Sequence, residues 1–256
     1  PNHRPGRLAL ALAFLLLHPA SARAIWAPDP YTGMSVCSAG NDQTAPQVVP
    51  DGAGGVIVTW EDRRAGSQFD IYAQRLNAAG IPQWTSNGVA VCAATSDQRV
   101  PTIASDGAGG AIITWYDYRS SGFPDIYAQR INASGVAQWT STGVAICTAG
   151  LEQYNPKIVP FGTNGAVITW VDYRGGATSD IYAQRIDGSG AAQWGANGLS
   201  VCNAANDQWD PVIASDGTYA FIAWRDVRST IDQGIYVQQF NAAGTGLCGG
   251  NGIITT

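Results

Sequence analysis

Histidine is almost absent from this chain of 256 residues. Its two histidines, His3 and His18, both lie within the first 24 residues. The remainder therefore cannot build a Ser-His-Asp or Cys-His catalytic site, or a zinc site with imidazole ligands. Carboxylates are the only plausible catalytic groups that are left.

Basic charge is also scarce. Lys and Arg total 14 against 19 Asp and Glu, which gives a formal net charge of −5. Three of the basic residues and none of the acidic ones lie in residues 1–24, so the net charge without that segment is −8. We therefore expect no nucleic-acid partner.

Long apolar runs are missing except for the ten residues from Leu8 to Leu17. Such a run is too short for a bilayer, which needs ~20 apolar residues. Basic residues precede it and Ala22-Arg23-Ala24 follows it, a pattern typical of a secretory signal peptide. We expect a signal peptide over 1–24, a linker over 25–32, and a mature chain that is secreted or at the cell surface and does not insert into a membrane.

A tandem repeat with a period of about 55 residues occupies the rest of the chain. A Trp, an Asp and an Arg stand two apart in every copy, as in Trp60, Asp62 and Arg64. In an extended strand this spacing puts all three on one face. After a short turn-like stretch, an Asp-Ile-Tyr run begins another β-rich segment, which predicts a hairpin.

Folding this hairpin about residue 67 places Arg64 opposite Asp70 and Asp62 opposite Tyr72. A cross-strand pair of opposite charges contributes about 0.2–1 kcal/mol where solvent reaches it. We therefore interpret the repeated charges as a structural clasp. Its expected members are Asp62, Arg64, Asp70, Asp117, Arg119, Asp125, Asp172, Arg174, Asp180, Asp226 and Arg228.

Each period contains four short β-rich runs joined by tight turns and no helical periodicity. This pattern predicts an all-β fold, a β-propeller of four-stranded antiparallel blades. A β-helix is the main rival. The repeats occupy 33–256, with blades at about 46–92, 101–147, 156–202 and 211–256.

The fourth run of the period, Gly-Val-x-Val-Cys in its clearest form, occurs five times, because an extra copy at 33–37 precedes the first blade. A closed ring of four blades needs only four such strands. We therefore expect a partial ring, an open arc or a strained small ring belonging to a propeller of roughly six to eight blades.

Four of the five cysteines, Cys37, Cys92, Cys147 and Cys202, take the same place in successive copies of this run. Their Cα atoms should be farther apart than the ~7 Å limit for a disulfide. We expect buried free thiols, with Cys248 as the one candidate exception.

The string D-G-A-G-G-A-I-I-T-W-Y-D-Y-R, followed by D-I-Y-A-Q-R and G-V-A-I-C, resembles the tandem repeats of secreted bacterial β-propeller proteins. The resemblance covers residues 33–256 and implies the fold, but no shared chemistry. The sialidase-type box S-x-D-x-G-x-x-W is only faintly echoed by Ser105-Asp106-Gly107, because Trp115 lies too far along.

Polar residues in two kinds of loop should share one end of the ring, because loops alternate between the two ends of a blade. The residues that break the repeat are Glu61, Arg99, Tyr154, Asn155, Trp209, Asp210 and Asp232. An exposed Trp beside an Asp suits a sugar; alternatively, Trp209 caps a neighbouring blade. The candidate ligand-binding residues are Tyr154, Asn155, Trp209, Asp210, Asp97, Gln98, Asp207 and Gln208.

From this we expect a secreted, non-catalytic binding or adhesion module whose partner is an extracellular glycan or a surface protein, with no catalytic residue, cofactor or metal. Calcium near Asn206-Asp207 or Asp42 is conceivable, but no D-x-D-x-D-G loop exists. One alternative is a carbohydrate-active enzyme with two carboxylates within about 10 Å of each other. Another is a purely structural segment of a larger surface protein.

Overall fold

The computed structural model describes residues 33–120, 122–229 and 232–254, in which strands form four antiparallel sheets of four strands each. The expected signal peptide (1–24) and linker (25–32) lie outside the described residues. The first two sheets contain β1 (Gln43–Pro50), β2 (Val56–Asp62), β3 (Asp70–Leu76) and β4 (Val89–Cys92), then β5 (Gln98–Ser105), β6 (Ala111–Asp117), β7 (Asp125–Ile131) and β8 (Val144–Cys147). The others contain β9 (Gln153–Pro160), β10 (Ala166–Asp172), β11 (Asp180–Ile186) and β12 (Leu199–Cys202), then β13 (Gln208–Ser215), β14 (Ala220–Asp226), β15 (Gly234–Phe240) and β16 (Ile253–Ile254).

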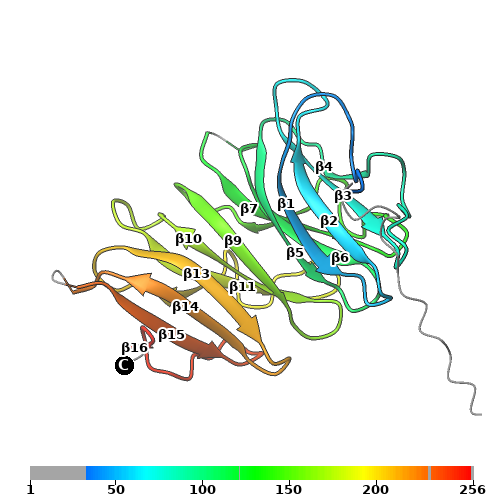
Figure 1. Ribbon diagram of the computed structural model, residues 1–256. Coiled ribbons are helices and arrows are strands. Elements are labelled where there is room, and N and C mark those ends of the chain that lie inside the picture. Colours follow the sequence, from blue (N-terminus) through cyan, green and yellow to red (C-terminus); the bar gives the residue numbers. More distant parts are fainter. Residues whose placement is uncertain (1–32, 121, 230–231, 255–256) are drawn as a thin grey trace, which may run out of the picture.

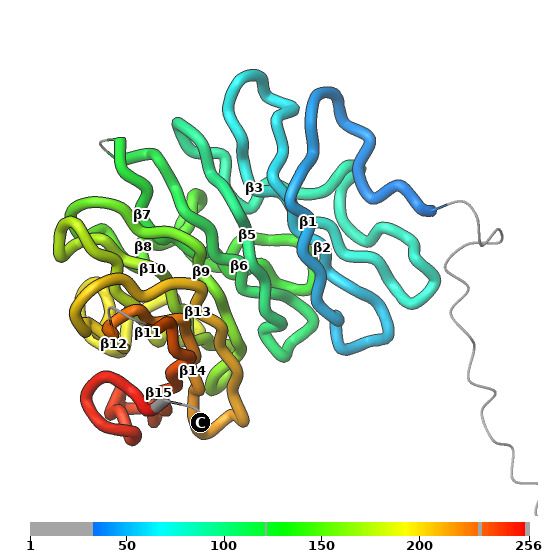
Figure 2. The backbone as a smooth tube through the Cα atoms, turned by 60° about the vertical axis from the view of Figure 1, so that its left-hand side comes forward, coloured from blue at the N-terminus to red at the C-terminus, as the bar shows by residue number. Residues whose placement is uncertain are grey.

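The four sheets follow one another as the blades of a β-propeller (Figure 1). Strands β1, β5, β9 and β13 are the inner strands, and each contacts the next along the fan (Figure 2). The first and the fourth sheet lie at opposite ends of the row in both views. The prediction of an all-β propeller with four-stranded blades is confirmed, and the four blades form an open arc. No helix that could cross a membrane occurs in the described part of the chain.

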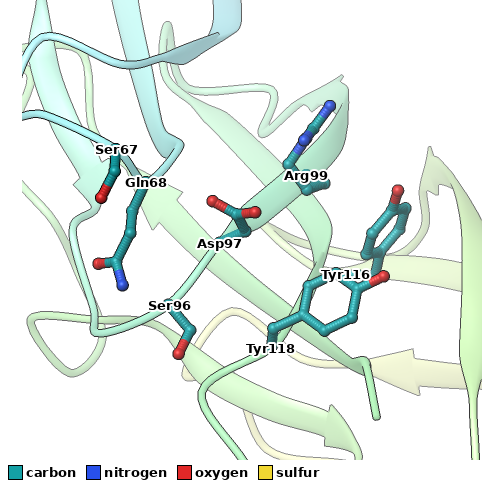
Figure 3. A pocket seen from close by; sticks show the side chains of 7 residues that line it. All are labelled: Ser67, Gln68, Ser96, Asp97, Arg99, Tyr116 and Tyr118. Atoms are coloured by element: carbon teal, nitrogen blue, oxygen red, sulfur yellow. The ribbon is translucent and has the colours of Figure 1, made fainter. Parts of the chain in front are cut away.

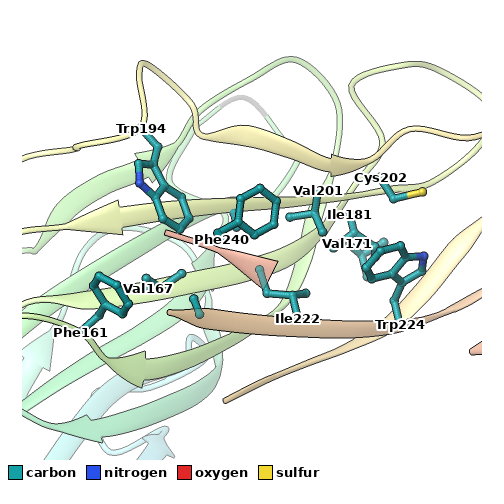
Figure 4. Close-up of a cluster of buried hydrophobic side chains, with 12 residues drawn as sticks. Phe161, Val167, Val171, Ile181, Trp194, Val201, Cys202, Ile222, Trp224 and Phe240 are labelled. Atoms are coloured by element: carbon teal, nitrogen blue, oxygen red, sulfur yellow. The ribbon is translucent and has the colours of Figure 1, made fainter. Parts of the chain in front are cut away.

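The hydrophobic core lies between the blades. One cluster joins the first two blades through Ile71, Cys92 and Trp115. Another joins the third and fourth blades, where Val201 and Phe240 come together (Figure 4). A single blade therefore cannot bury its own faces, and its stability depends on its neighbours.

The hairpin between the second and third strands of each blade differs from the expected register. Asp62 lies opposite Asp70 and Trp60 opposite Tyr72, two residues away from the expected pairing. Strand β2 ends at Asp62, so Arg64 belongs to the turn and cannot pair across the sheet with Asp70. The other three hairpins have the same register.

The clasp is instead formed within one segment of the chain. Arg64 folds back so that its Nη2 lies 2.6 Å from Asp62 Oδ2, and its guanidinium lies 3.8 Å from the centre of the Tyr72 ring. Asp62 also accepts hydrogen bonds from Trp60 Nε1 and from the backbone N–H of Arg64. The prediction of a clasp between Arg64 and Asp70 is therefore wrong in its partners, and the carboxylate that Arg64 does bind is fully buried.

Asp70, Asp125 and Asp180 are thus left outside the ion pair to which we had assigned them. Burial, followed by the charge of the facing carboxylate, raises the pKa of Asp70 to about 6. The corresponding pKa values of Asp125 and Asp180 are also raised to about 6, mainly by burial. These side chains oppose folding when they are ionised.

The cysteines link each blade to the clasp of the next one. Cys92 Sγ lies 3.0 Å from Arg119 Nη2, and the same contact recurs at the later boundaries. Residues 33–37 form no strand, contrary to expectation, yet Cys37 makes the equivalent contact with Arg64 at 3.3 Å. All five cysteines, including Cys248, are unpaired, and burial raises the pKa of the Cys92 thiol to about 12.

Candidate functional site

Every inner strand contains a β-bulge near its start, where the register shifts against the neighbouring strand. The bulged residue has a left-handed backbone in all four blades, which is uncommon outside glycine and costly for a β-branched residue. The four residues, with their φ angles, are Ala45 (50°), Val100 (52°), Asn155 (50°) and Asp210 (54°). The backbone therefore repeats at a position where the side chains do not.

A buried glutamine holds each of the three later bulges in place. Gln98 is fully buried, its Nε2 donates to Ser96 O at 2.8 Å, and its backbone N–H donates to Phe69 O of the preceding blade. Gln153 and Gln208 make the corresponding contacts. Gln98 and Gln208, which we expected to bind a ligand, are therefore buried residues that hold the backbone in place.

Asp97 and Asp207 also bind the framework. Asp97 Oδ1 accepts from Phe69 N at 2.8 Å, and Asp207 Oδ1 accepts from Ser179 N at 2.8 Å. Each carboxylate therefore fastens a blade to the hairpin of the preceding one. Of the two, Asp97 also lines a cavity.

The residues that break the repeat come together beside the bulges. Across the inner strand and its neighbour, Thr44 faces Glu61, Arg99 faces Tyr116, Tyr154 lies beside Val171, and Trp209 faces Arg225. We call this surface the variable row. Its members are Thr44, Glu61, Arg99, Tyr116, Tyr154, Asn155, Val171, Trp209, Asp210 and Arg225.

The sequence pattern identified six members of the variable row by their lack of symmetry, but it missed Thr44, Tyr116, Val171 and Arg225. Tyr116, Val171 and Arg225 take the place of Glu61 in the repeat, and Thr44 takes the place of Arg99, so the same comparison could have found them. Asp232 belongs to the hairpin between β14 and β15 and is not part of the row.

Two cavities open along the row. The first, of about 460 Å³, lies among Asp97, Arg99, Tyr116 and Tyr118 (Figure 3). The second, of about 250 Å³, extends to the fourth blade, and Tyr116 lines both. The residues around the second cavity are Tyr116, Tyr154, Asn155, Val171, Tyr173, Trp209, Asp210 and Arg225.

The end of the row at the first blade is closed by charge pairing. Glu61 is 2% exposed and accepts from Thr44 Oγ1 at 2.9 Å and from Val100 N at 2.7 Å. Arg99 Nε lies 3.1 Å from the same carboxylate. Glu61 therefore holds the unfavourable left-handed backbone of Val100. Because its carboxylate oxygens already bind these groups of the protein, we assign Glu61 a structural role.

The other end of the row is aromatic and more open. The Tyr116 and Tyr154 rings lie edge to face at 5.8 Å, and Tyr173 follows Tyr154 at 6.1 Å. The guanidinium of Arg225 lies 4.7 Å from the Trp209 ring and forms an ion pair with Asp210 at 3.1 Å.

Trp209 fits both of the interpretations that the sequence allowed. It packs against the core between the third and fourth blades, and it also lines the second cavity. Aromatic faces beside hydrogen-bonding groups can stack on and orient a polar ring-shaped ligand. No cluster of three or more His, Cys, Asp or Glu suited to a metal ion occurs among the residues that the structure describes.

The chain matches no family model and no curated protein at the level of sequence. Among solved structures it is similar to the α-L-arabinanase of Penicillium chrysogenum complexed with arabinobiose, with 13% identity, a TM-score of 0.51, and coverage of 84% of this chain and 69% of that one. It is more distantly similar to an endo-arabinase from Bacteroides thetaiotaomicron (11% identity, TM-score 0.43, 79% and 78% covered). A thermostable family-43 glycoside hydrolase is at a similar distance (11% identity, TM-score 0.44, 84% and 72% covered).

At these identities the likeness establishes the propeller fold alone. The structure with a TM-score above 0.5 is an arabinanase, however, and this finding favours the enzyme alternative over the function class that we expected. The expectation of a non-catalytic binding module without enzymatic activity is therefore wrong, and the alternative, an enzyme, is the function to develop.

Proposed function

We propose that this chain is the propeller of a secreted carbohydrate-active enzyme, related to the tandem-repeat propellers of bacteria, and that its glycan substrate lies along the aromatic end of the variable row. One observation carries the proposal. A bulge that every blade shares brings non-repeating side chains to a single cavity, where Tyr116, Tyr154, Tyr173 and Trp209 surround it. A purely structural repeat has no need for this local loss of symmetry.

The chemistry of this surface suits a sugar. Tyrosine and tryptophan rings stack on the apolar faces of pyranose and furanose rings, while Asn155 and Arg225 can bind hydroxyl groups. The two cavities share Tyr116, so an elongated ligand can occupy both. Their combined size is that of a small-molecule site.

Two carboxylates are placed to take part in hydrolysis. Asp210 lines the second cavity, with Arg225 offsetting its charge. Burial raises the pKa of Tyr154, which lines the same cavity, and the neighbouring Glu152 raises it further. Most glycoside hydrolases use a pair of carboxylates, and a site without histidine is compatible with that chemistry.

The arabinanase with the same fold makes α-L-arabinan the first substrate to test. Residues 25–256 should be incubated with arabinan and a panel of plant and algal polysaccharides, and newly formed reducing ends measured. Asp210→Asn should lower the rate by on the order of 10²-fold or more, as expected for a lost acid–base group.

Tyr219→Ala is a matched control, because Tyr219 lies in the turn after β13, at the opposite end of that strand from the bulge. It should leave the rate unchanged. Absence of cleavage across the whole panel, or equal losses in the two variants, would refute the proposal.

A further inference from the structure

One position of the repeat lies between the two charged residues of the clasp and varies from blade to blade. Its backbone N–H donates to the carbonyl of the crossover residue that precedes the inner strand of the same blade, at 2.9 to 3.1 Å. The four occupants of this position are Arg63, Tyr118, Tyr173 and Val227. The backbone is therefore fixed in every blade, whereas the side chain is not.

Tyrosine occupies this position in the second and third blades, where it extends the aromatic end of the variable row. The Tyr118 ring lies 5.8 Å from Tyr116 at an angle of 79°, and the Tyr173 ring lies 6.1 Å from Tyr154 at an angle of 78°. Tyr116 and Tyr154 are themselves in contact, at 5.8 Å. The four tyrosines thus form one continuous series of edge-to-face rings across two blades.

This series of rings connects the two cavities. Tyr118 lines the first cavity, Tyr154 and Tyr173 line the second, and Tyr116 lines both. Asp210, the carboxylate proposed for hydrolysis, lines the second cavity. A ligand that reaches into both cavities would therefore place a separate part of itself in the first.

The first cavity has the two kinds of wall that a sugar residue needs. In Figure 3, the rings of Tyr116 and Tyr118 lie on one side of Asp97, and Ser67 and Gln68 lie on the other. Aromatic rings stack on the apolar face of a sugar, whereas amide and hydroxyl groups bind its hydroxyls. The backbone hydrogen bond from Tyr118 N to Asp97 O holds the ring in position before a ligand arrives, which lowers the cost of ordering it.

We infer that the first cavity is a distal sugar subsite, in which Tyr118 stacks on a sugar residue remote from the bond that is cleaved. The substrate is then a linear glycan long enough to reach from Tyr118 to Asp210. The inference rests on the proposed function for the nature of the ligand. A short oligosaccharide binds in the second cavity, where Tyr154, Tyr173 and Trp209 gather, and does not reach Tyr118. Affinity should therefore increase with the length of the chain.

The variants Tyr118→Ala and Tyr173→Ala form a matched pair, because the two tyrosines hold the same place in successive copies of the repeat. Titration calorimetry compares arabinobiose with a longer linear chain, arabinohexaose. Tyr118→Ala should weaken the longer chain by roughly five- to tenfold and leave arabinobiose unchanged, whereas Tyr173→Ala should weaken both. Tyr118→Phe keeps the ring and should bind the longer chain as the native protein does. The inference would be overturned if Tyr118→Ala changed the affinity for both ligands equally, or for neither.

A second measurement follows the rings directly. In tyrosine-labelled NMR spectra, the ring signals of Tyr118 should shift on addition of arabinohexaose but not of arabinobiose, while those of Tyr173 should shift with both. Binding of both ligands with unmoved Tyr118 signals would contradict the distal subsite alone. A native chain that binds no oligosaccharide from any polysaccharide of the panel would contradict the proposed function and, with it, this inference.

Discussion

Two neighbouring residues of β6 belong to different parts of the molecule. Trp115 is fully buried, donates from Nε1 to Asp117, and recurs in all four blades. Tyr116, on the other face of the strand, lines both cavities and has no counterpart of its kind in the other blades. Because side chains alternate between the faces of a strand, one face can hold the fold while the other varies. The variants below test this separation.

The largest expected effect is that of Trp115→Ala. Removing a fully buried indole should lower the free energy of unfolding by about 3–5 kcal/mol. Tyr116→Ala should cost less than half as much, because Tyr116 is only partly buried. Denaturant titrations of both variants measure the difference, and equal losses would show that the two faces are not separate.

Arg119→Ala should follow, at roughly 3 kcal/mol, the lower end for a broken buried ion pair, because it leaves the buried Asp117 carboxylate without its cation. This is more than a solvent-exposed clasp would lose. Arg63→Ala is the matched control, since Arg63 pairs at 3.7 Å with an exposed Asp42 and should contribute well under about 1 kcal/mol. Similar losses of unfolding free energy for the two variants in urea titrations would show that the clasp behaves as a solvent-exposed ion pair.

Asp70 should make stability depend on pH in an unusual direction. Its folded-state pKa of about 6 lies above the ordinary value of about 4, so its favourable contribution is present below pH 4 and is lost as the pH rises to 6. Asp70→Asn should therefore raise the melting temperature at pH 7 and flatten its fall between pH 4 and 6.

Asp226 should make stability depend on pH in the opposite direction to Asp70. Burial works against it, but hydrogen bonds from Arg228 and Trp224 lower its pKa, so its contribution is present above pH 4 and is lost on acidification. Asp226→Asn should thus reduce stability most at neutral pH. A melting-temperature profile in which both variants shift in the same direction at pH 7 would contradict these assignments.

The smallest effect on stability is expected for Trp209→Ala. Loss of one stacking ring should weaken an arabino-oligosaccharide of micromolar affinity by roughly five- to tenfold, with little change in melting temperature. Calorimetry and thermal unfolding of the same sample distinguish the outcomes. A large fall in melting temperature with unaltered affinity would assign Trp209 to the core alone.

Much of this arrangement could be predicted from the sequence. Repetition at 55 residues indicated the blades, and the departures at Tyr154, Asn155, Trp209 and Asp210 indicated where the repeat ceases to be structural. These signals are strong because each copy acts as a reference for the others.

The hairpin register could not be obtained in the same way. Turn residues have no periodicity, so the sequence did not show whether Arg64 ends a strand or begins a turn. The bulges were missed because the proline that follows each bulged residue is equally typical of a plain strand start. The choice between enzyme and binding module depended on a comparison with solved structures of similar fold. A single sequence does not supply that comparison.

The left-handed bulge has a consequence for how such a protein can change over time. The backbone of the bulge is the same in every blade. The side chains at residues 99–100, 154–155 and 209–210 can therefore differ from blade to blade without a change of backbone conformation. Duplication of a blade copies this backbone, and later mutations can change the side chains of one pair while the backbone of the bulge is kept. Exchanging residues 154–155 with residues 99–100 should therefore move ligand recognition by one blade, at a cost in stability because the buried Glu61 loses Arg99 as its cation.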